Sequence, residues 1–139
     1  MTSSLVGSEM CIRDSSMMAV NAKQELVGGV ILPGPQLSLS ALVKNTAQLP
    51  QIDLAAKAPA SILGKSTSSC LQNGFVLGTA SLLDGLAERF CAELGPQTAF
   101  YATGNLPIPI REACCTPILY RETLITDGLY RIWMKNKKG

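Results

Sequence analysis

The segment from Cys70 to Leu94 constrains the fold most, because its apolar residues recur at helical spacing along two neighbouring ridges. One ridge carries Leu71, Phe75, Leu82, Leu86 and Phe90, and the other carries Val76, Leu83, Ala87 and Cys91. Charged residues leave the segment short of the roughly 18 uncharged apolar residues that a membrane span needs. Both ridges must therefore be covered by protein, one by a sheet and one by a second copy. Because Gly74, Gly78 and Gly85 permit close helix contact, we predict a homodimer through this helix.

The rest of the chain alternates between strand-like and helix-like segments. Strand patterns cover residues 17–20, 25–32, 98–105 and 117–120, and helical patterns cover residues 35–49 and 122–136. Residues 51–62 fit a strand or an extended link, and Pro107 and Pro109 indicate a loop. The Gly28-Gly29 pair interrupts its strand, which is typical of a bulge or of the close approach of a backbone or ligand. This alternation predicts an α/β fold, with a mixed sheet layered with helices.

The first fifteen residues, MTSSLVGSEMCIRDS, do not fit this organisation. They have no basic start and no helix or strand period, so they predict neither a signal peptide nor a structural element. The string resembles translated sequencing-adapter remnants found at the broken ends of gene predictions. We therefore expect residues 1–15 to be non-native and residues 16–139 to form a single lobe, truncated at its N-terminus.

Composition excludes several kinds of chemistry. The chain has no histidine, which removes imidazole bases, Ser-His and Cys-His nucleophile pairs and histidine-based metal sites. The net charge of +2 comes from lysines at the C-terminus, so no nucleic-acid surface is predicted. The five cysteines form no CxxC pair, and we interpret them as reduced thiols of a cytoplasmic protein. Cys70 and Cys91 are expected in the core, and the adjacent Cys114 and Cys115 receive no role.

The string Gly-Lys-Ser-Thr at residues 64–67 resembles the end of a phosphate-binding P-loop. That loop needs a further glycine five residues before Gly64, where this chain has Pro59, which offers no backbone N–H and fixes φ. A different role is therefore predicted. Either Ser66 or Thr67 caps the following helix, and the other hydroxyl is left free to face a ligand. Lys65 is either solvated or close enough to help hold a carboxylate.

Asp84 and Glu88 are four residues apart on the long helix. Such a pair can serve acid–base chemistry, but like charges at this spacing repel unless a cation joins them. Because Arg89 is adjacent, a surface or subunit-contact role is favoured.

Three ordered segments resemble the C-terminal half of type III pantothenate kinases: GGVILPGPQLSLSAL, ILGKSTSSCLQNGFVLGTASLLDGLAERF, and YATGNLPIPI with the tail TLITDGLYRIW. The resemblance implies a ribonuclease-H-like lobe of the actin-like ATPase superfamily. It also implies ATP-dependent phosphorylation of pantothenate, the first step of coenzyme A synthesis, in the cytoplasm. Mg²⁺ and a monovalent cation, K⁺ or NH₄⁺, are implied for the complete enzyme, as is a homodimer.

The resemblance also implies roles for individual residues. Thr67 matches the threonine that contacts pantothenate, and Gly104 matches the first glycine of a Thr-Gly-Gly turn against the adenosine of ATP. Asn105 replaces the second glycine of that turn, although asparagine tolerates positive φ. Gly28 and Gly29 match a strand beside the nucleotide turn.

The catalytic aspartate and both Asp-x-Gly phosphate turns of the family would lie before residue 16, and Ser15 and Ser16 fall where the last turn ends. We therefore expect an inactive lobe of a kinase. The alternative is a non-catalytic dimerisation or regulatory module of the same fold. The coding sequence upstream of codon 16 distinguishes the two, because only the kinase needs both turns.

Overall fold

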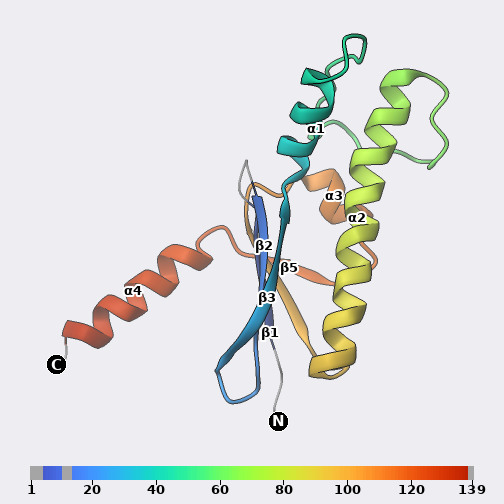
Figure 1. Cartoon of the computed structure of the whole chain (residues 1–139). Helices are drawn as coiled ribbons and strands as arrows, with labels where there is room; N and C mark the ends of the chain where they lie inside the picture. Colours follow the sequence, from blue (N-terminus) through green and yellow to red (C-terminus); the bar gives the residue numbers. More distant parts are fainter. Residues whose placement is uncertain (1–4, 11–13, 138–139) are drawn as a thin grey trace.

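The computed structural model describes residues 5–10 and 14–137, which form five strands and four helices (Figure 1). The strands are β1 (Leu5–Met10), β2 (Asp14–Val20), β3 (Leu26–Pro33), β4 (Ala99–Gly104) and β5 (Ile118–Tyr120). The helices are α1 (Pro35–Lys44), α2 (Thr67–Leu94), α3 (Ile108–Ala113) and α4 (Leu124–Lys137). The predicted α/β class with a mixed sheet is confirmed, and residues 51–62 are a link without a strand.

The sheet has the strand order β3-β2-β1-β4-β5. Strand β2 runs antiparallel to both of its neighbours, β1 and β3, whereas β1 pairs parallel with β4 and β4 pairs parallel with β5. The β2–β3 register shifts between Ala19 and Val20, beside Gly28, as the bulge alternative predicts. A Cβ at Gly29 would lie 2.3 Å from the Met17 carbonyl oxygen, as the alternative of close backbone approach predicts. The carboxyl ends of β1, β4 and β5 consequently lie along the same edge of the sheet.

The expectation that residues 1–15 contain no structural element is wrong. Residues 5–10 form the central strand β1, hydrogen-bonded on both sides, and β2 begins at Asp14. A short run suffices here because Val6, 1% exposed, contributes to the core while the neighbouring strands satisfy the backbone of β1. Residues 1–4 and 11–13 lie outside the described part. The non-native origin of the segment stays a prediction.

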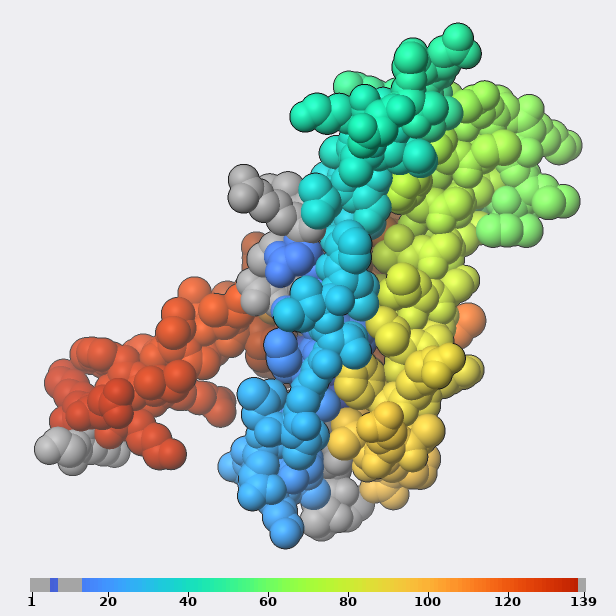
Figure 2. Space-filling model, viewed as in Figure 1, coloured from blue at the N-terminus to red at the C-terminus, as the bar shows by residue number. Residues whose placement is uncertain are grey.

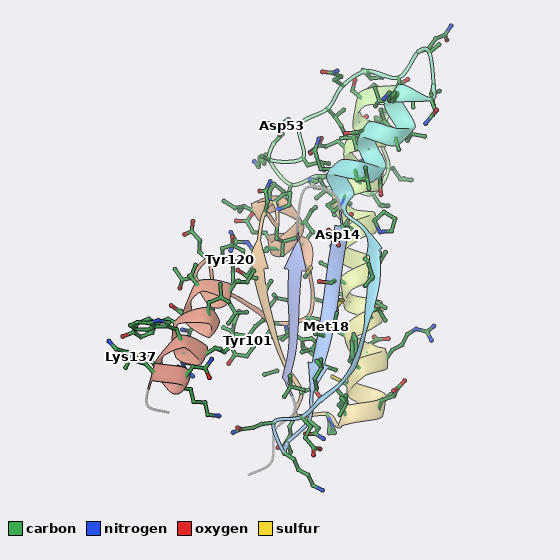
Figure 3. The ribbon with its side chains drawn as sticks, turned by 60° about the vertical axis from the view of Figure 1, so that its left-hand side comes forward. Asp14, Met18, Asp53, Tyr101, Tyr120 and Lys137 are labelled. Atoms are coloured by element: carbon green, nitrogen blue, oxygen red, sulfur yellow. The ribbon has the colours of Figure 1, made fainter. Side chains whose placement is uncertain are left out.

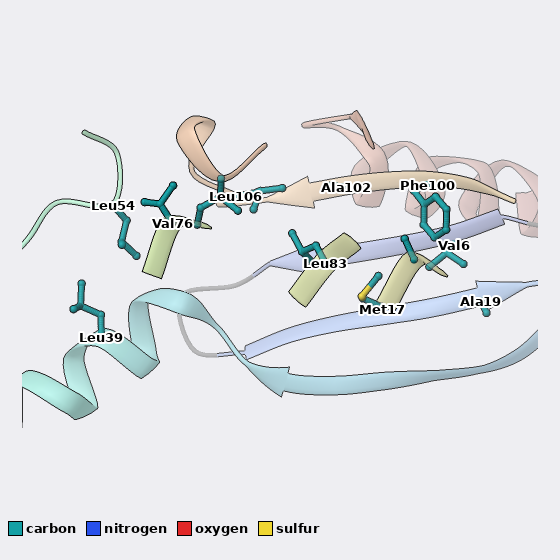
Figure 4. Packing of buried hydrophobic residues seen from close by; sticks show 12 residues of the cluster. Val6, Met17, Ala19, Leu39, Leu54, Val76, Leu83, Phe100, Ala102 and Leu106 are labelled. Atoms are coloured by element: carbon teal, nitrogen blue, oxygen red, sulfur yellow. The ribbon is translucent and has the colours of Figure 1, made fainter. Parts of the chain in front are cut away.

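Helix α2 covers one face of the sheet and forms the core with it (Figure 4). Its buried apolar residues are Val76, Ala80, Leu83 and Ala87, spaced four, three and four apart, as expected for one helical face. They pack with Met17, Val6 and Phe100 from three neighbouring strands. The ridge that carries Leu82 is divided, because Phe75, Leu86 and Phe90 pack against the core whereas Leu82 is 44% exposed. Cys91 packs against the core as expected, but Cys70 is exposed.

Pro107 and Pro109 begin a helix instead of marking a loop. Pro109 falls in the first turn of α3, where a missing backbone N–H costs nothing because no intrahelical partner exists there. Ile110 is fully buried and fixes α3 near the middle of α2. The proline pair therefore positions the connection that follows β4.

The opposite face of the sheet is largely uncovered. Met18 and Tyr101, labelled in Figure 3, lie on this face, and Met18 is 39% exposed. Helix α4 extends away from this side of the molecule, and the space-filling view shows it standing apart from the body (Figure 2). Within the described residues, no helix has the length and apolar character required to cross a membrane.

Candidate functional site

The Gly-Lys-Ser-Thr corner is a helix start built from reciprocal hydrogen bonds. Ser66 is the N-cap residue of α2, and its Oγ accepts a hydrogen bond from the Ser69 backbone N–H at 3.2 Å. The Ser69 Oγ in turn accepts from the backbone N–H groups of Lys65 and Ser66, each at 2.9 Å. A side chain at Gly64 would place its Cβ 2.5 Å from the Cys70 backbone N, so this corner needs glycine for close approach to the helix.

Thr67 is left free by this arrangement. It is the first residue of α2 and is exposed, and its hydroxyl makes no hydrogen bond within the described part of the chain. The backbone N–H groups of Thr67 and Ser68 likewise find no partner among the described residues. Because free N–H groups and the helix dipole favour an anion, the exposed end of α2 can receive a carboxylate next to the Thr67 hydroxyl. Lys65 is exposed beside Thr67, as expected both for a solvated lysine and for a lysine that helps to hold a carboxylate.

The loop before α2 is held in place by a buried amide. Asn73, 7% exposed, donates from Nδ2 to the Ser61 carbonyl at 2.8 Å and to the Ile62 carbonyl at 3.3 Å. Both bonds tie the link to the second turn of α2. The position of the free Thr67 hydroxyl is therefore fixed from the loop side as well as by the cap.

The second predicted site residue lies at the carboxyl edge of the sheet. Gly104 ends β4 with φ of 81°, a left-handed conformation that favours glycine. Asn105 follows it, is exposed and does not have a positive φ, so a second glycine is not required by this backbone. In open α/β sheets, ligands bind outside the carboxyl ends of parallel strands, which is where Gly104 and Asn105 lie.

Sequence reasoning missed Tyr120, which contacts Gly104, and Arg111, which contacts Tyr120. The Tyr120 hydroxyl donates a hydrogen bond to the Gly104 carbonyl, and the guanidinium of Arg111 lies 4.2 Å from the centre of the Tyr120 ring. The sequence signal that could have identified Tyr120 was its position at the end of a predicted strand, which pairs parallel with β4 in the structure. No sequence signal was available for Arg111, because it lies on α3, a helix that the sequence did not predict.

Ser15 lies at the same edge of the sheet as Gly104. Met10 pairs with Gly104 on one side and with Ser15 on the other, so these three residues form one row across β4, β1 and β2. Ser15 is 1% exposed, and its hydroxyl has no hydrogen-bond partner within the described residues. An unpaired buried hydroxyl is costly, which makes this row a point where a polar group is expected to approach.

The structure does not bring Thr67 and Gly104 together. Helix α3, which follows Gly104, contacts α2 near Ala80, where the Cys114 thiol approaches the Ala80 carbonyl at 4.0 Å. Ala80 follows Thr67 by 13 residues, which corresponds to about 20 Å along a helix. The two predicted subsites are therefore separate surfaces of one copy.

Asp84 has a structural role that differs from the predicted surface or subunit contact. Its carboxylate accepts hydrogen bonds from the backbone N–H groups of Cys115 at 2.9 Å and Thr116 at 2.8 Å. Burial acts to raise the pKa of Asp84, but these hydrogen bonds outweigh it and leave the pKa below its usual 3.8. Asp84 thus fastens the turn between α3 and β5 to α2, which sets the position of Tyr120.

Asp84→Asn should lower the free energy of unfolding by about 1–3 kcal/mol, because an amide oxygen replaces a charged acceptor and one backbone N–H loses its partner. The folded-state pKa is lowered, so the stabilisation is present above pH 3.8 and lost as the pH falls below it. Urea unfolding at pH 7 and pH 3 measures the difference. Glu88→Gln, on an exposed residue of the same helix, is the control and should change stability by less than about 0.5 kcal/mol. Equal effects of the two variants would contradict this role.

Cys114 and Cys115 differ although they are adjacent. Cys114 is half-buried and donates from Sγ to the Ile110 carbonyl at 3.2 Å, whereas Cys115 is exposed. Burial, followed by the charges of Asp84 and Cys115, raises the pKa of the Cys114 thiol to about 11. Cys114 therefore stays a neutral thiol near pH 7 and is unsuited to nucleophilic chemistry.

The described residues offer no group of three or more histidine, cysteine, aspartate or glutamate side chains that could hold a metal ion. Gly28 and Gly29 line a pocket of about 290 Å³ with Arg89 and Phe90. This pocket lies between β3 and α2, away from Thr67.

Comparison with known proteins places these features in one family. The family described as type III pantothenate kinase matches residues 16–89. A type III pantothenate kinase of Koribacter versatilis is 40% identical over 121 residues, which cover 86% of this chain and 43% of that protein. One from Frankia alni is 36% identical over 122 residues, covering 88% of this chain and 48% of that protein. The chain thus spans less than half the length of these curated relatives.

A solved structure shares the fold. The crystal structure of a conserved Baf family protein from Campylobacter jejuni superposes with a TM-score of 0.56 at 19% identity. The match covers 96% of this chain and 58% of that one. At this identity the comparison supports the fold alone.

Proposed function

The chain belongs to the type III pantothenate kinase family, and we propose that it supplies the pantothenate-binding lobe of an enzyme that transfers phosphate from ATP to pantothenate. The observation that carries this proposal is the free Thr67 hydroxyl beside the unpaired N–H groups of the α2 start. Pantothenate has a carboxylate and hydroxyl groups, which fit these donors. The cap formed by Ser66 is what keeps Thr67 available.

The strand order supports a finer fold assignment. Only β2 runs antiparallel in the order β3-β2-β1-β4-β5, and the helices follow β3, β4 and β5. We assign this arrangement to the ribonuclease-H-like lobe of the actin-like ATPases. In that assignment the carboxyl edge with Gly104 and Asn105 faces the adenosine of ATP.

The nucleotide side of the proposal rests on Gly104 and Asn105. Gly104 and Asn105 are both exposed at this edge, and Asn105 stands where the family has glycine, so a flat base can approach both residues. Mg²⁺ and a monovalent cation are implied for the whole enzyme. The acidic residues of the described part do not cluster to hold either ion. The implied reaction belongs to the cytoplasm, which we propose as the location.

The experiment that tests the proposal is a kinase assay coupled to ADP release. It uses a chimera in which residues 16–139 follow the preceding segment of the Koribacter versatilis relative, with pantothenate and ATP varied separately. Release of ADP that saturates with pantothenate supports the proposal. Release that pantothenate does not stimulate would favour a different substrate, and a folded chimera without turnover would favour the non-catalytic module.

We also propose a homodimer through the exposed side of α2. Gly74 and Gly78 are exposed, and a Cβ built on either meets no atom within 4 Å. Leu82, on the neighbouring turn, is 44% exposed. A second copy can therefore approach the backbone of α2 closely and cover the leucine.

Gly78→Leu should convert the dimer to a monomer without unfolding the chain, because a Cβ at this position meets no atom of its own copy within 4 Å while the larger side chain separates the two helices. Sedimentation velocity over a concentration series measures this. Gly128→Leu, in α4, is the matched control because its Cβ also meets no atom within 4 Å. An unchanged dimer in the Gly78 variant would place the interface elsewhere.

A further inference from the structure

Arg111 is a cation without an anionic partner in the described part of the chain. Its guanidinium lies 4.2 Å from the centre of the Tyr120 ring, and no described carboxylate forms an ion pair with it. Both side chains are half-buried. A guanidinium that stacks on an aromatic ring with one face can still offer its second face and its N–H edge to a ligand. The pair therefore presents a flat, cationic surface, which we call the Arg111–Tyr120 stack.

The Arg111–Tyr120 stack is held in a fixed position beside Gly104. Ile110 is fully buried and fixes α3 against α2. The Asp84 carboxylate accepts hydrogen bonds at 2.9 Å and 2.8 Å from the turn that leads into β5. The Tyr120 hydroxyl donates to the Gly104 carbonyl. A surface that is already ordered loses little conformational freedom when a ligand binds, so the stack is suited to recognition.

The strand order gives a direction to a nucleotide bound along this edge. Ser15, at the end of the family's last phosphate turn, lies on β2, and Gly104, assigned to adenosine, lies on β4. Tyr120 ends β5, which is one strand beyond β4 in the order β3-β2-β1-β4-β5, and it lies near the carboxyl ends of the strands (Figure 3). A nucleotide whose phosphates lie toward β2 and whose sugar lies at Gly104 consequently directs its base toward β5.

The chemistry of the stack matches a base better than a phosphate. A purine has a flat π surface and ring nitrogens that accept hydrogen bonds, and proteins stack bases on guanidinium planes and aromatic rings. A guanidinium also binds phosphate. However, the phosphate turn belongs to the β2 side of Gly104, whereas Arg111 and Tyr120 lie on the β5 side. The order of the strands therefore favours the base.

We propose that Arg111, supported by Tyr120, stacks on the purine base of the nucleotide and determines the specificity for the phosphate donor. The inference deepens the proposed function and rests on it for the place of adenosine at Gly104. The planar shape of the guanidinium is the property that matters, because a point charge cannot stack on a base.

Steady-state kinetics of the chimera with the Koribacter segment tests the proposal. Arg111→Ala should raise the KM for ATP about tenfold and leave the KM for pantothenate unchanged. Arg111→Lys keeps the charge but lacks the plane, so it should behave like Arg111→Ala. Arg89→Ala, on an exposed arginine of α2, is the control and should change neither KM.

Two results of these kinetics would overturn the proposal. An unchanged KM for ATP in Arg111→Ala, or full rescue by lysine, would exclude stacking on the base. A rise of both KM values together with a lower urea midpoint would give Arg111 a structural role instead.

The chain alone supplies a second measurement, which does not depend on the chimera folding. Saturation-transfer NMR with adenosine should show contact with the base protons, and Arg111→Ala should raise the apparent Kd for adenosine about tenfold. Ribose 5-phosphate should respond equally to the chain and to the variant. A loss of ribose 5-phosphate binding in the variant would mean that Arg111 binds phosphate, and no contact of adenosine with the unmodified chain would also overturn the proposal.

The two measurements separate this inference from the proposed function. Turnover of the chimera that pantothenate does not stimulate would remove the proposed function, and the adenosine titration would still decide the role of Arg111. Normal pantothenate kinetics, with equal adenosine binding by the chain and by Arg111→Ala, would remove only the role of Arg111.

Discussion

The chain alone should release no ADP above a protein-free blank when it is supplied with pantothenate, ATP, Mg²⁺ and K⁺. Phosphoryl transfer depends on positioned phosphate contacts, a metal and a residue that orients the nucleophile. The sequence contains no Asp-x-Gly turn, and its described acidic residues do not cluster as metal ligands. Because those contacts supply nearly all of the catalysis in this reaction class, we expect loss of turnover to the level of the blank.

The chimera with the Koribacter segment is the positive control in the same coupled assay. Pantothenate-dependent turnover by the chimera and none by the chain would show that residues 16–139 can contribute to a working kinase and that the chain alone lacks residues that the reaction needs. Turnover by the chain alone would contradict this prediction if it persisted through every purification step and saturated with pantothenate. It would mean that catalytic residues outside the family pattern are present.

The sequence predicted the elements whose signal is periodic or chemically sharp. The length of α2 and its buried face follow from apolar spacing at Val76, Leu83 and Ala87, and β2 and β3 follow from the strand patterns at residues 17–20 and 25–32. The helix cap at Ser66 was one of two alternatives, and the geometry selects it because Ser69 completes the reciprocal pair. These features depend on local chemistry, which the sequence carries directly.

Features that depend on long-range contacts were missed. Strand β1 has little pattern of its own and is fixed by pairing with β2 and β4. Asp84 was expected at the surface, but its partners are backbone N–H groups more than 30 residues away. Arg111 meets the Tyr120 ring, and Tyr120 meets Gly104, only because α3 and β5 lie next to each other and β5 pairs with β4. Such contacts have no signature within a short window of sequence.

The separation of Thr67 from Gly104 also lay beyond the sequence. The resemblance to a family motif assigns a ligand to each residue but gives no distance between the residues. In the structure Thr67 begins α2, whereas the helix that follows Gly104 contacts α2 near Ala80. The start of α2 can consequently be tested for pantothenate binding without disturbing the sheet edge that carries Gly104.

The central claim is that the Thr67 hydroxyl binds pantothenate, and Thr67→Val in the chimera tests it most directly. Valine keeps the shape of the side chain, and the Ser66 cap remains to hold the helix. The unmade hydrogen bond to substrate costs about 1–3 kcal/mol, so the apparent pantothenate affinity should fall about tenfold to a hundredfold. The apparent ATP affinity should stay the same.

The measurement is steady-state kinetics with each substrate varied in turn, comparing Thr67→Val with Ser68→Ala as the control on the adjacent exposed hydroxyl. The account predicts a raised KM for pantothenate in the Thr67 variant only, with the KM for ATP unchanged in both. Normal pantothenate saturation by Thr67→Val would contradict it. So would loss of nucleotide binding on Lys65→Ala, which is the behaviour of a phosphate loop.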